Sequence, residues 1–160
     1  MKNHAVNGQV APSVEMVRSR GALIKALLSL AMGGFAIGTG EFVIMGLLPD
    51  AAHGLGVSIP SAGHLISIYA LGVVVGAPVL AVAGARLSRK TFLIILMAMF
   101  AAGNLMSAWA PDYELMLLMR FIAGIPHGTF FGVAALLAAE LVERSRRAQA
   151  VSMVLLGLTV

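Results

Sequence analysis

Long apolar stretches separated by short polar segments set the pattern of this chain. Four of the stretches each reach the roughly 20 residues that a helix needs to cross a hydrocarbon core. They occupy about 22–48, 61–85, 91–110 and 114–141. A fifth stretch, 148–160, has only 13 residues, too few to cross. We therefore expect an all-α membrane protein whose transmembrane part covers residues 21–160.

Two polar segments lie outside these spans. Residues 1–20 contain Pro12 and no sustained apolar period, which is typical of an aqueous tail. Residues 49–60 combine Pro, Asp and Gly, and this composition predicts a loop.

The composition agrees with the pattern. Of the 160 residues, 59% are hydrophobic and only 11% are charged, against about 25% charged in a typical water-soluble domain. This excludes a soluble globular protein. The chain has no cysteine, so a disulfide framework, a thiolate metal site and a cysteine nucleophile are excluded as well.

The positions of the basic residues explain the net charge of +4. Apart from Arg120, all the Lys and Arg residues lie on one side of a serial four-span weave, before or at the start of the first span, between the second and third, and after the fourth. The loops on the other side carry Asp50, Asp112 and Glu114 and no Lys or Arg. The excess of Lys and Arg in cytoplasmic loops predicts a multi-pass membrane protein with a cytoplasmic N-terminus. It also argues against nucleic acid as a partner and favours attraction to anionic lipid head groups.

Two charged residues lie well inside the predicted spans. Glu41 is eight residues before Pro49, roughly 12 Å from the outer end of its span, and Arg120 is nine residues after Pro111, roughly 13 Å from the same membrane face. Antiparallel helices would therefore bring them to similar depth. An acid beside a fixed guanidinium can exchange that partner for a proton, which predicts proton coupling. The alternative is a structural ion pair that fixes helix packing.

Three further polar residues lie near this layer. Tyr69 and Asn104 fall at similar depth in the second and third spans, which suggests a shared substrate cavity. His127 lies two turns after Arg120 on the same helix face and could relay protons near neutral pH. The alternatives are ordinary hydrogen bonds to a helix backbone for Asn104 and His127, and packing near the membrane interface for Tyr69.

Glycines repeat at helical spacing in three of the spans. Such stripes let helix backbones approach closely, so we expect them to pack helices and to turn Glu41 and Arg120 away from lipid. The stripes consist of Gly34 and Gly38, of Gly72 and Gly76, and of Gly124, Gly128 and Gly132.

Patterns for other chemistries are missing from the sequence. It has no phosphate-binding loop after a strand, no metal-ligand spacing and no nucleophile-elbow serine. We therefore expect no catalytic residues, no metal and no cofactor.

The sequence over residues 21–160 resembles the N-terminal part of the major facilitator superfamily, specifically its twelve-span drug:proton antiporter group, which includes arabinose and multidrug efflux permeases. GTGEFVIMGLLPDAAHGLGVS (38–58) is similar to the first-span signature of that group, and SAGHLISIYALGVVVGAPVLA (61–81) to its second span. LMRFIAGIPHGTFFGV (118–133) resembles the fourth-span signature, in which an arginine precedes a glycine by four. The resemblance implies a role of Arg120 in proton coupling.

The loop between the second and third spans departs from the family pattern G-x-L-A-D-R-x-G-R-K. Arg86, Arg89 and Lys90 are retained, but Ala85 replaces the acid. The resemblance implies a cytoplasmic gating loop, and the missing acid leaves open the alternative that the three cations only set topology.

The resemblance implies a proton-coupled efflux transporter that exports a sugar or a lipophilic drug across the bacterial inner membrane by alternating access. Such transporters have two six-helix halves, so the chain would be part of the N-terminal half, and its partners would be protons, a small-molecule substrate, the bilayer and the missing C-terminal half. Two alternatives stay open. One is a complete small four-span dimeric proton antiporter, and the other is a membrane assembly or regulatory protein without transport activity.

Overall fold

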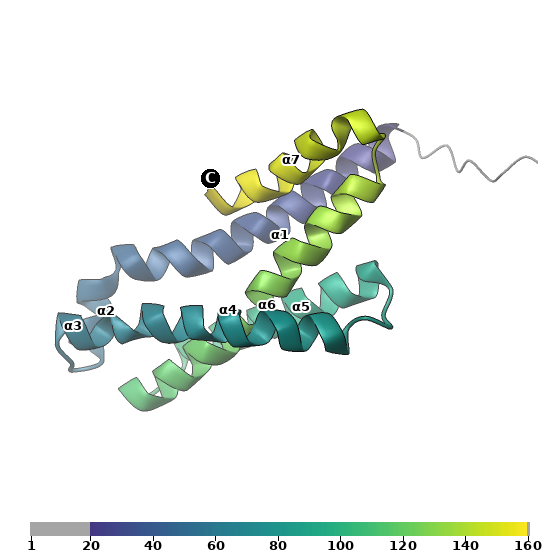
Figure 1. Cartoon of the computed structure of the whole chain (residues 1–160). Helices are drawn as coiled ribbons and strands as arrows, with labels where there is room; N and C mark the ends of the chain where they lie inside the picture. Colours follow the sequence, from purple (N-terminus) through teal and green to yellow (C-terminus); the bar gives the residue numbers. More distant parts are fainter. Residues whose placement is uncertain (1–19, 160) are drawn as a thin grey trace, which may run out of the picture.

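The computed structural model describes residues 20–159, and all regular structure in that range is helical (Figure 1). The elements in chain order are α1 (Arg20–Gly46), α2 (Leu48–Gly54), α3 (Ile59–Ala62), α4 (His64–Ala83), α5 (Arg89–Ala108), α6 (Tyr113–Glu140), the 3₁₀ helix η1 (Arg144–Arg146) and α7 (Arg147–Thr159). The tail expected at 1–20 lies outside the described residues except for Arg20, the first residue of α1.

Four helical segments are long and apolar enough to cross a membrane, namely α1, the continuous stretch Ile59–Ala83, α5 and α6. Only 22% of the most apolar window of Ile59–Ala83 is buried inside the protein. The remaining side chains face outward, among them Val74 and Val82, which are 70% and 79% exposed. Apolar side chains turned outward along membrane-length helices confirm the prediction of a partial all-α membrane fold.

The prediction of a loop over residues 49–60 is wrong for most of that range, which is helical in α2 and α3. Pro49 lies in the first turn of α2, where the missing N–H of proline needs no partner, and Asp50 in the same turn complements the helix dipole. Pro60 holds the same position in α3, whose N-cap Ser58 accepts a hydrogen bond from the Ser61 N–H. The residues that suggested a loop instead begin two short helices.

Side-chain caps also fix where α5 and α6 begin. The Ser88 hydroxyl oxygen accepts a hydrogen bond from the Thr91 N–H at 3.2 Å, and an Asp112 carboxylate oxygen accepts one from the Leu115 N–H at 2.8 Å. Each satisfies an N–H that has no partner within the helix. Both helices therefore begin at defined residues, which fixes the register of the side chains they carry inward.

A very close crossing of α4 and α6 organises the bundle. A Cβ on Gly124 would collide with the Tyr69 carbonyl oxygen, and one on Gly72 would collide with the Phe121 carbonyl oxygen. A Cβ on Gly128 would lie 3.0 Å from the Cβ of Ala77. Only residues without a side chain permit this backbone approach.

The pairing of α1 with α7 repeats this crossing. A Cβ on Gly34 would lie 2.8 Å from the Val154 carbonyl oxygen, and one on Gly38 would collide with that of Leu158. In return, a Cβ on Gly157 would collide with the Ala31 carbonyl oxygen. Helices α1 and α7 thus meet as α6 and α4 do, which is the contact pattern of an internal structural repeat.

Gly132 departs from the expected packing stripe. No atom of the described part of the chain lies within 4 Å of the position that its Cβ would take. No helix therefore approaches Gly132 closely, although it continues the spacing of Gly124 and Gly128.

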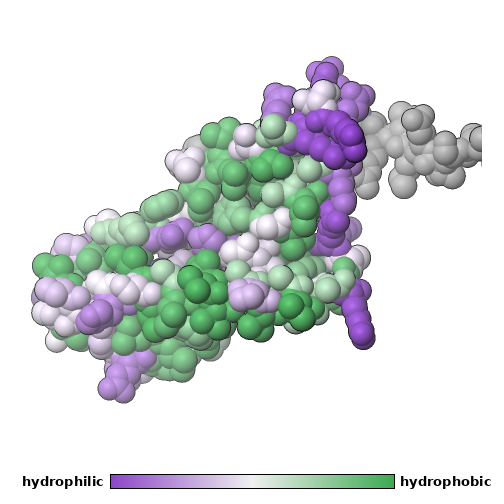
Figure 2. All heavy atoms as spheres, in the orientation of Figure 1, coloured by the Kyte–Doolittle hydropathy of each residue, from purple (hydrophilic) through white to green (hydrophobic). Residues whose placement is uncertain are grey.

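The two ends of the bundle differ in charge. We call the end where α1, α5 and α7 begin and where α4 and α6 finish the basic end. Hydrophilic side chains gather there beside α7, and a largely hydrophobic surface separates them from the opposite end, where α2 and α3 lie (Figures 1 and 2). Among the described residues, the basic end carries Arg20, Lys25, Arg86, Arg89, Lys90, Arg144, Arg146 and Arg147 against Glu140 and Glu143.

Candidate functional site

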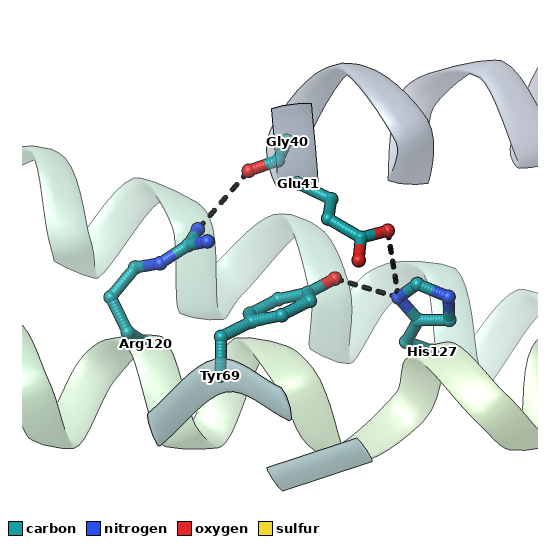
Figure 3. A network of polar contacts seen from close by, with 5 residues as sticks. All are labelled: Gly40, Glu41, Tyr69, Arg120 and His127. Atoms are coloured by element: carbon teal, nitrogen blue, oxygen red, sulfur yellow. Dashed lines mark hydrogen bonds and ion pairs between the residues drawn. The ribbon is translucent and has the colours of Figure 1, made fainter. Parts of the chain in front are cut away.

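Three helices bring a polar cluster together inside the bundle (Figure 3). Glu41 comes from α1, Tyr69 from α4, and Arg120 and His127 from α6. Tyr69 and Arg120 are buried, with 1% and 4% of their surface exposed. Polar groups held at this depth in an apolar bundle need partners, and these four residues supply most of one another's.

Arg120 is held by two contacts. Its Nη1 donates a hydrogen bond to the Gly40 carbonyl oxygen on α1 at 3.2 Å, and its guanidinium carbon lies 4.4 Å from the centre of the Tyr69 ring. A desolvated cation over an aromatic face is stabilised by about 2 kcal/mol. Arg120 of α6 therefore contacts α1 through the Gly40 carbonyl and α4 through the Tyr69 ring.

One nitrogen of His127 faces two possible partners. Its Nδ1 lies 3.0 Å from the Tyr69 hydroxyl oxygen and 3.9 Å from Oε2 of Glu41. Without a proton, Nδ1 can accept the hydrogen bond of the Tyr69 hydroxyl. With a proton, it can donate to the Glu41 carboxylate or to the Tyr69 oxygen. The position of this proton therefore decides how the acid, the imidazole and the phenol are connected.

The expected direct pairing of Glu41 with Arg120 is not seen. Among the described residues, acid–base contacts within 4 Å join Arg89 to Glu140 and Glu41 to His127, and the second is an ion pair only when the imidazole is protonated. Side chains on a helix lean toward its N-terminus, and α1 begins at the basic end, so the Glu41 carboxylate points that way. His127 is two turns nearer the basic end than Arg120, and the carboxylate reaches it while Arg120 binds the adjacent Gly40 peptide (Figure 3).

Asn104 lies beside this cluster, and its side-chain amide binds outside it. A Cβ on Gly40 would lie 3.4 Å from Asn104 Oδ1. The Asn104 Nδ2 donates to the Phe100 carbonyl oxygen of its own helix at 2.9 Å. Asn104 thus borders the Gly40 peptide that Arg120 binds, and its hydrogen bond is to its own helix rather than to a neighbouring one.

The three cations expected in the gating loop have different environments. Arg89, in the first turn of α5, forms an ion pair with Glu140 at the end of α6 at 2.5 Å. Lys90 lines an apolar cavity between α1, α5 and α6. Arg86 is exposed in the turn between α4 and α5. The pair of Arg89 with Glu140 ties this turn to the end of α6.

Sequence reasoning missed several contacts that hold α6 to α3 and α4. The Thr129 hydroxyl donates to the Ala77 carbonyl oxygen at 3.2 Å. Near the opposite end, the Tyr113 hydroxyl donates to the Ser61 carbonyl oxygen at 2.6 Å and lies 3.1 Å from Nδ1 of His64. The only sequence signal for Thr129 is its place one residue after Gly128, where the two backbones are close.

Comparison with known proteins identifies the family. Residues 30–160 match the model of the Major Facilitator Superfamily. The chain belongs to this superfamily. It is 50% identical over 133 residues to the inner membrane transport protein YdhP of Escherichia coli (strain K12), a match that covers 83% of this chain and 34% of YdhP.

Two further relatives show the same partial coverage. The chain is 45% identical to the putative transporter AraJ of Escherichia coli (strain K12), over 85% of this chain and 34% of AraJ. It is 35% identical to a chloramphenicol resistance protein of Streptomyces lividans, over 84% of this chain and 34% of that protein. The chain therefore spans about a third of the length of these relatives. These matches agree with the resemblance of the chain to the drug:proton antiporter group of the superfamily.

Proposed function

We propose that this chain forms part of the N-terminal half of a proton-coupled efflux transporter. The observation that carries the proposal is the cluster of Glu41, Tyr69, Arg120 and His127, a protonatable acid and an imidazole held next to a fixed cation within membrane-spanning helices. Ionisable groups at such depth belong to ion and substrate pathways by default.

In the proposed mechanism, Glu41 takes up and releases the coupling proton. The Glu41 side chain keeps 28% of its surface exposed, so water or a proton donor can reach it, whereas Tyr69 and Arg120 are enclosed. When His127 is protonated, protonation of Glu41 removes the ionic attraction between the two side chains, and the Nδ1–H of His127 then pairs with the Tyr69 oxygen. Because the three side chains come from three helices, this exchange of partners changes the contact between α1 and the α4–α6 pair. The complete transporter would alternate access by such rearrangements between its halves.

Arg120 is proposed to hold the layer in place rather than to move. It binds the Gly40 peptide directly before Glu41, so it fixes the backbone from which the carboxylate projects.

The proposed substrate is a lipophilic drug, with a sugar as the second candidate. A chloramphenicol resistance protein among the relatives supports the first choice. We also propose that the basic end faces the cytoplasm, because the cytoplasmic loops of membrane proteins carry an excess of Lys and Arg.

Export from proteoliposomes tests this function. The full-length protein that carries this segment would be reconstituted in vesicles loaded with radiolabelled chloramphenicol, with an acidic outside medium. We expect the pH gradient to accelerate efflux and Glu41→Gln to abolish the acceleration. Asp50→Asn, an acid of α2 outside the cluster, is the matched control and should leave it unchanged. Equal efflux with and without the gradient would contradict proton coupling.

A further inference from the structure

The Arg120 guanidinium is buried without a full set of partners. Only 4% of the residue is exposed, and its Nε has no hydrogen-bond partner among the described residues. Its Nη1 binds the Gly40 carbonyl oxygen, and its central carbon lies 4.4 Å from the centre of the Tyr69 ring. A guanidinium carries a fixed fork of N–H donors that matches a carboxylate. A carboxylate is therefore the partner that this buried cation would take if one came within reach.

Glu41 carries such a carboxylate close by. It directly follows Gly40, the residue whose carbonyl Arg120 already binds. Yet the Glu41 contact within 4 Å is with His127 and not with Arg120. Opposite charges attract strongly in an apolar interior, so a neighbouring acid and guanidinium stay apart only if other contacts hold them.

The Tyr69 ring is the contact that holds the guanidinium. Its own place is fixed at both ends. Its backbone carbonyl lies at the crossing of α4 and α6, where a Cβ on Gly124 would collide with it. Its hydroxyl lies 3.0 Å from Nδ1 of His127, and the two rings meet edge to face with their centres 5.8 Å apart. The guanidinium lies toward one end of this ring, and His127 and the Glu41 carboxylate lie near the hydroxyl end (Figure 3).

Few charged groups compete at this depth. Away from the two ends of the bundle, the titratable side chains of the described residues are Glu41 on α1, Tyr69 on α4, and Arg120 and His127 on α6. Helices α5 and α7 contribute none there, and Asn104 of α5 is neutral. The Glu41 carboxylate therefore has three possible partners, namely Arg120, His127 and a proton.

We infer that Tyr69 is a positioning residue that keeps the Arg120 guanidinium from pairing with Glu41, so that the acid exchanges a proton instead of forming a permanent ion pair. A carboxylate bound to a guanidinium is held in its ionised form. The inference rests on the proposed role of Glu41 as the proton site, and it adds the residue that keeps this site open.

Labelling with dicyclohexylcarbodiimide tests the inference. This hydrophobic reagent reacts with protonated carboxylic acids, so its incorporation at Glu41 falls as the acid loses its proton with rising pH. The full-length protein that carries this segment would be labelled over a range of pH, and peptide mass spectrometry would assign the label to Glu41. Tyr69→Leu removes the ring and releases Arg120. We expect it to lower the midpoint of labelling by about one to three pH units, the effect of an adjacent arginine on an acid.

Two controls assign the cause of the shift. In an Arg120→Gln background, Tyr69→Leu should leave the midpoint unchanged, because no guanidinium remains to pair with the acid. Leu96→Ala removes side-chain volume at another fully buried position, on α5, and should also leave the midpoint unchanged. A merely structural role of Tyr69 would make Leu96→Ala and Tyr69→Leu behave alike.

An unchanged midpoint in Tyr69→Leu would overturn the inference. So would a shift that persists in the Arg120→Gln background, which would assign it to His127. If Tyr69→Leu does not fold, Tyr69→Met removes the ring with a flexible side chain and gives the same comparison. Labelling measures the protonation of Glu41 without transport. An unchanged midpoint therefore leaves the proposed function standing, and drug export without proton movement would contradict the proposed function and not the labelling result.

Discussion

Substituting Gly124 by alanine should destabilise the bundle, although alanine is the better helix former. In the crossing of α4 and α6, the added Cβ would collide with the Tyr69 carbonyl oxygen and lie 3.2 Å from the Val73 nitrogen. Both are backbone atoms, which cannot rotate away as a flexible side chain could. The helices must therefore separate.

The magnitude follows from two opposing effects. Overpacking costs typically about 1–3 kcal/mol, and replacing an interior glycine by alanine stabilises a helix by about 1 kcal/mol. We expect Gly124→Ala to lower the free energy of unfolding by up to about 2 kcal/mol. Gly132→Ala, on the same helix, meets no described atom within 4 Å and should raise it by up to about 1 kcal/mol. The gain from helix propensity is common to both variants, so their difference of about 1–3 kcal/mol isolates the helix contact.

Cysteine labelling can measure this difference because the chain has no cysteine of its own. A single cysteine at Ala134, which is fully buried in α6, would serve as the common background. The fraction labelled along a titration from mild detergent into sodium dodecyl sulfate gives the unfolding midpoint of each variant. If Gly124→Ala and Gly132→Ala shift the midpoint equally, the close approach of α4 and α6 is wrong.

Two further predictions concern Tyr69 and the basic end. Tyr69→Phe removes the hydroxyl that lies 3.0 Å from Nδ1 of His127. It should lower the free energy of unfolding by about 1–3 kcal/mol in the same titration, because this nitrogen loses its hydrogen-bond partner. An unchanged midpoint would show that His127 finds another partner. Arg89→Glu should lower the free energy of unfolding by at most about 1 kcal/mol, because both side chains of the Arg89–Glu140 ion pair are partly exposed. The double variant with Glu140→Arg restores opposite charges and should recover the loss. If it does not, the two residues do not stabilise the protein through their mutual attraction.

The membrane spans could be predicted because their signal is local. Each consists of an apolar stretch of sufficient length, which needs no knowledge of its neighbours. The short helices α2 and α3 were missed because Pro49 and Pro60 are read equally well as loop residues or as first-turn residues. The choice between the two depends on a local geometry that composition does not contain.

The sequence predicted the depth of the site residues in the membrane, but not which of their side chains are in contact. A fixed rise per residue placed Glu41, Tyr69 and Arg120 in one layer, and the structure brings them together with His127. Which groups touch depends on how the helices are rotated and on where each side chain leans. Charge alone predicts that Arg120 pairs with Glu41. In the structure, Arg120 instead donates its hydrogen bond to the backbone carbonyl oxygen of Gly40.

The spacing of the glycines predicts close contacts equally at Gly124, Gly128 and Gly132. The structure has such contacts with α4 at the first two only, and no described atom lies within 4 Å of the position that a Cβ on Gly132 would take. The spacing of the glycines predicts which face of a helix they share. How far along the helix that face is in contact depends on the angle at which the two helices cross.

Proton movement driven by substrate tests the central claim most directly. Vesicles containing the full-length protein and an internal pH-sensitive dye would receive chloramphenicol with no imposed pH gradient. Our account predicts a change of internal pH that follows the drug flux, is lost in Glu41→Gln, and persists in Asp50→Asn. Drug flux without any change of internal pH, or an undiminished change in Glu41→Gln, would contradict it.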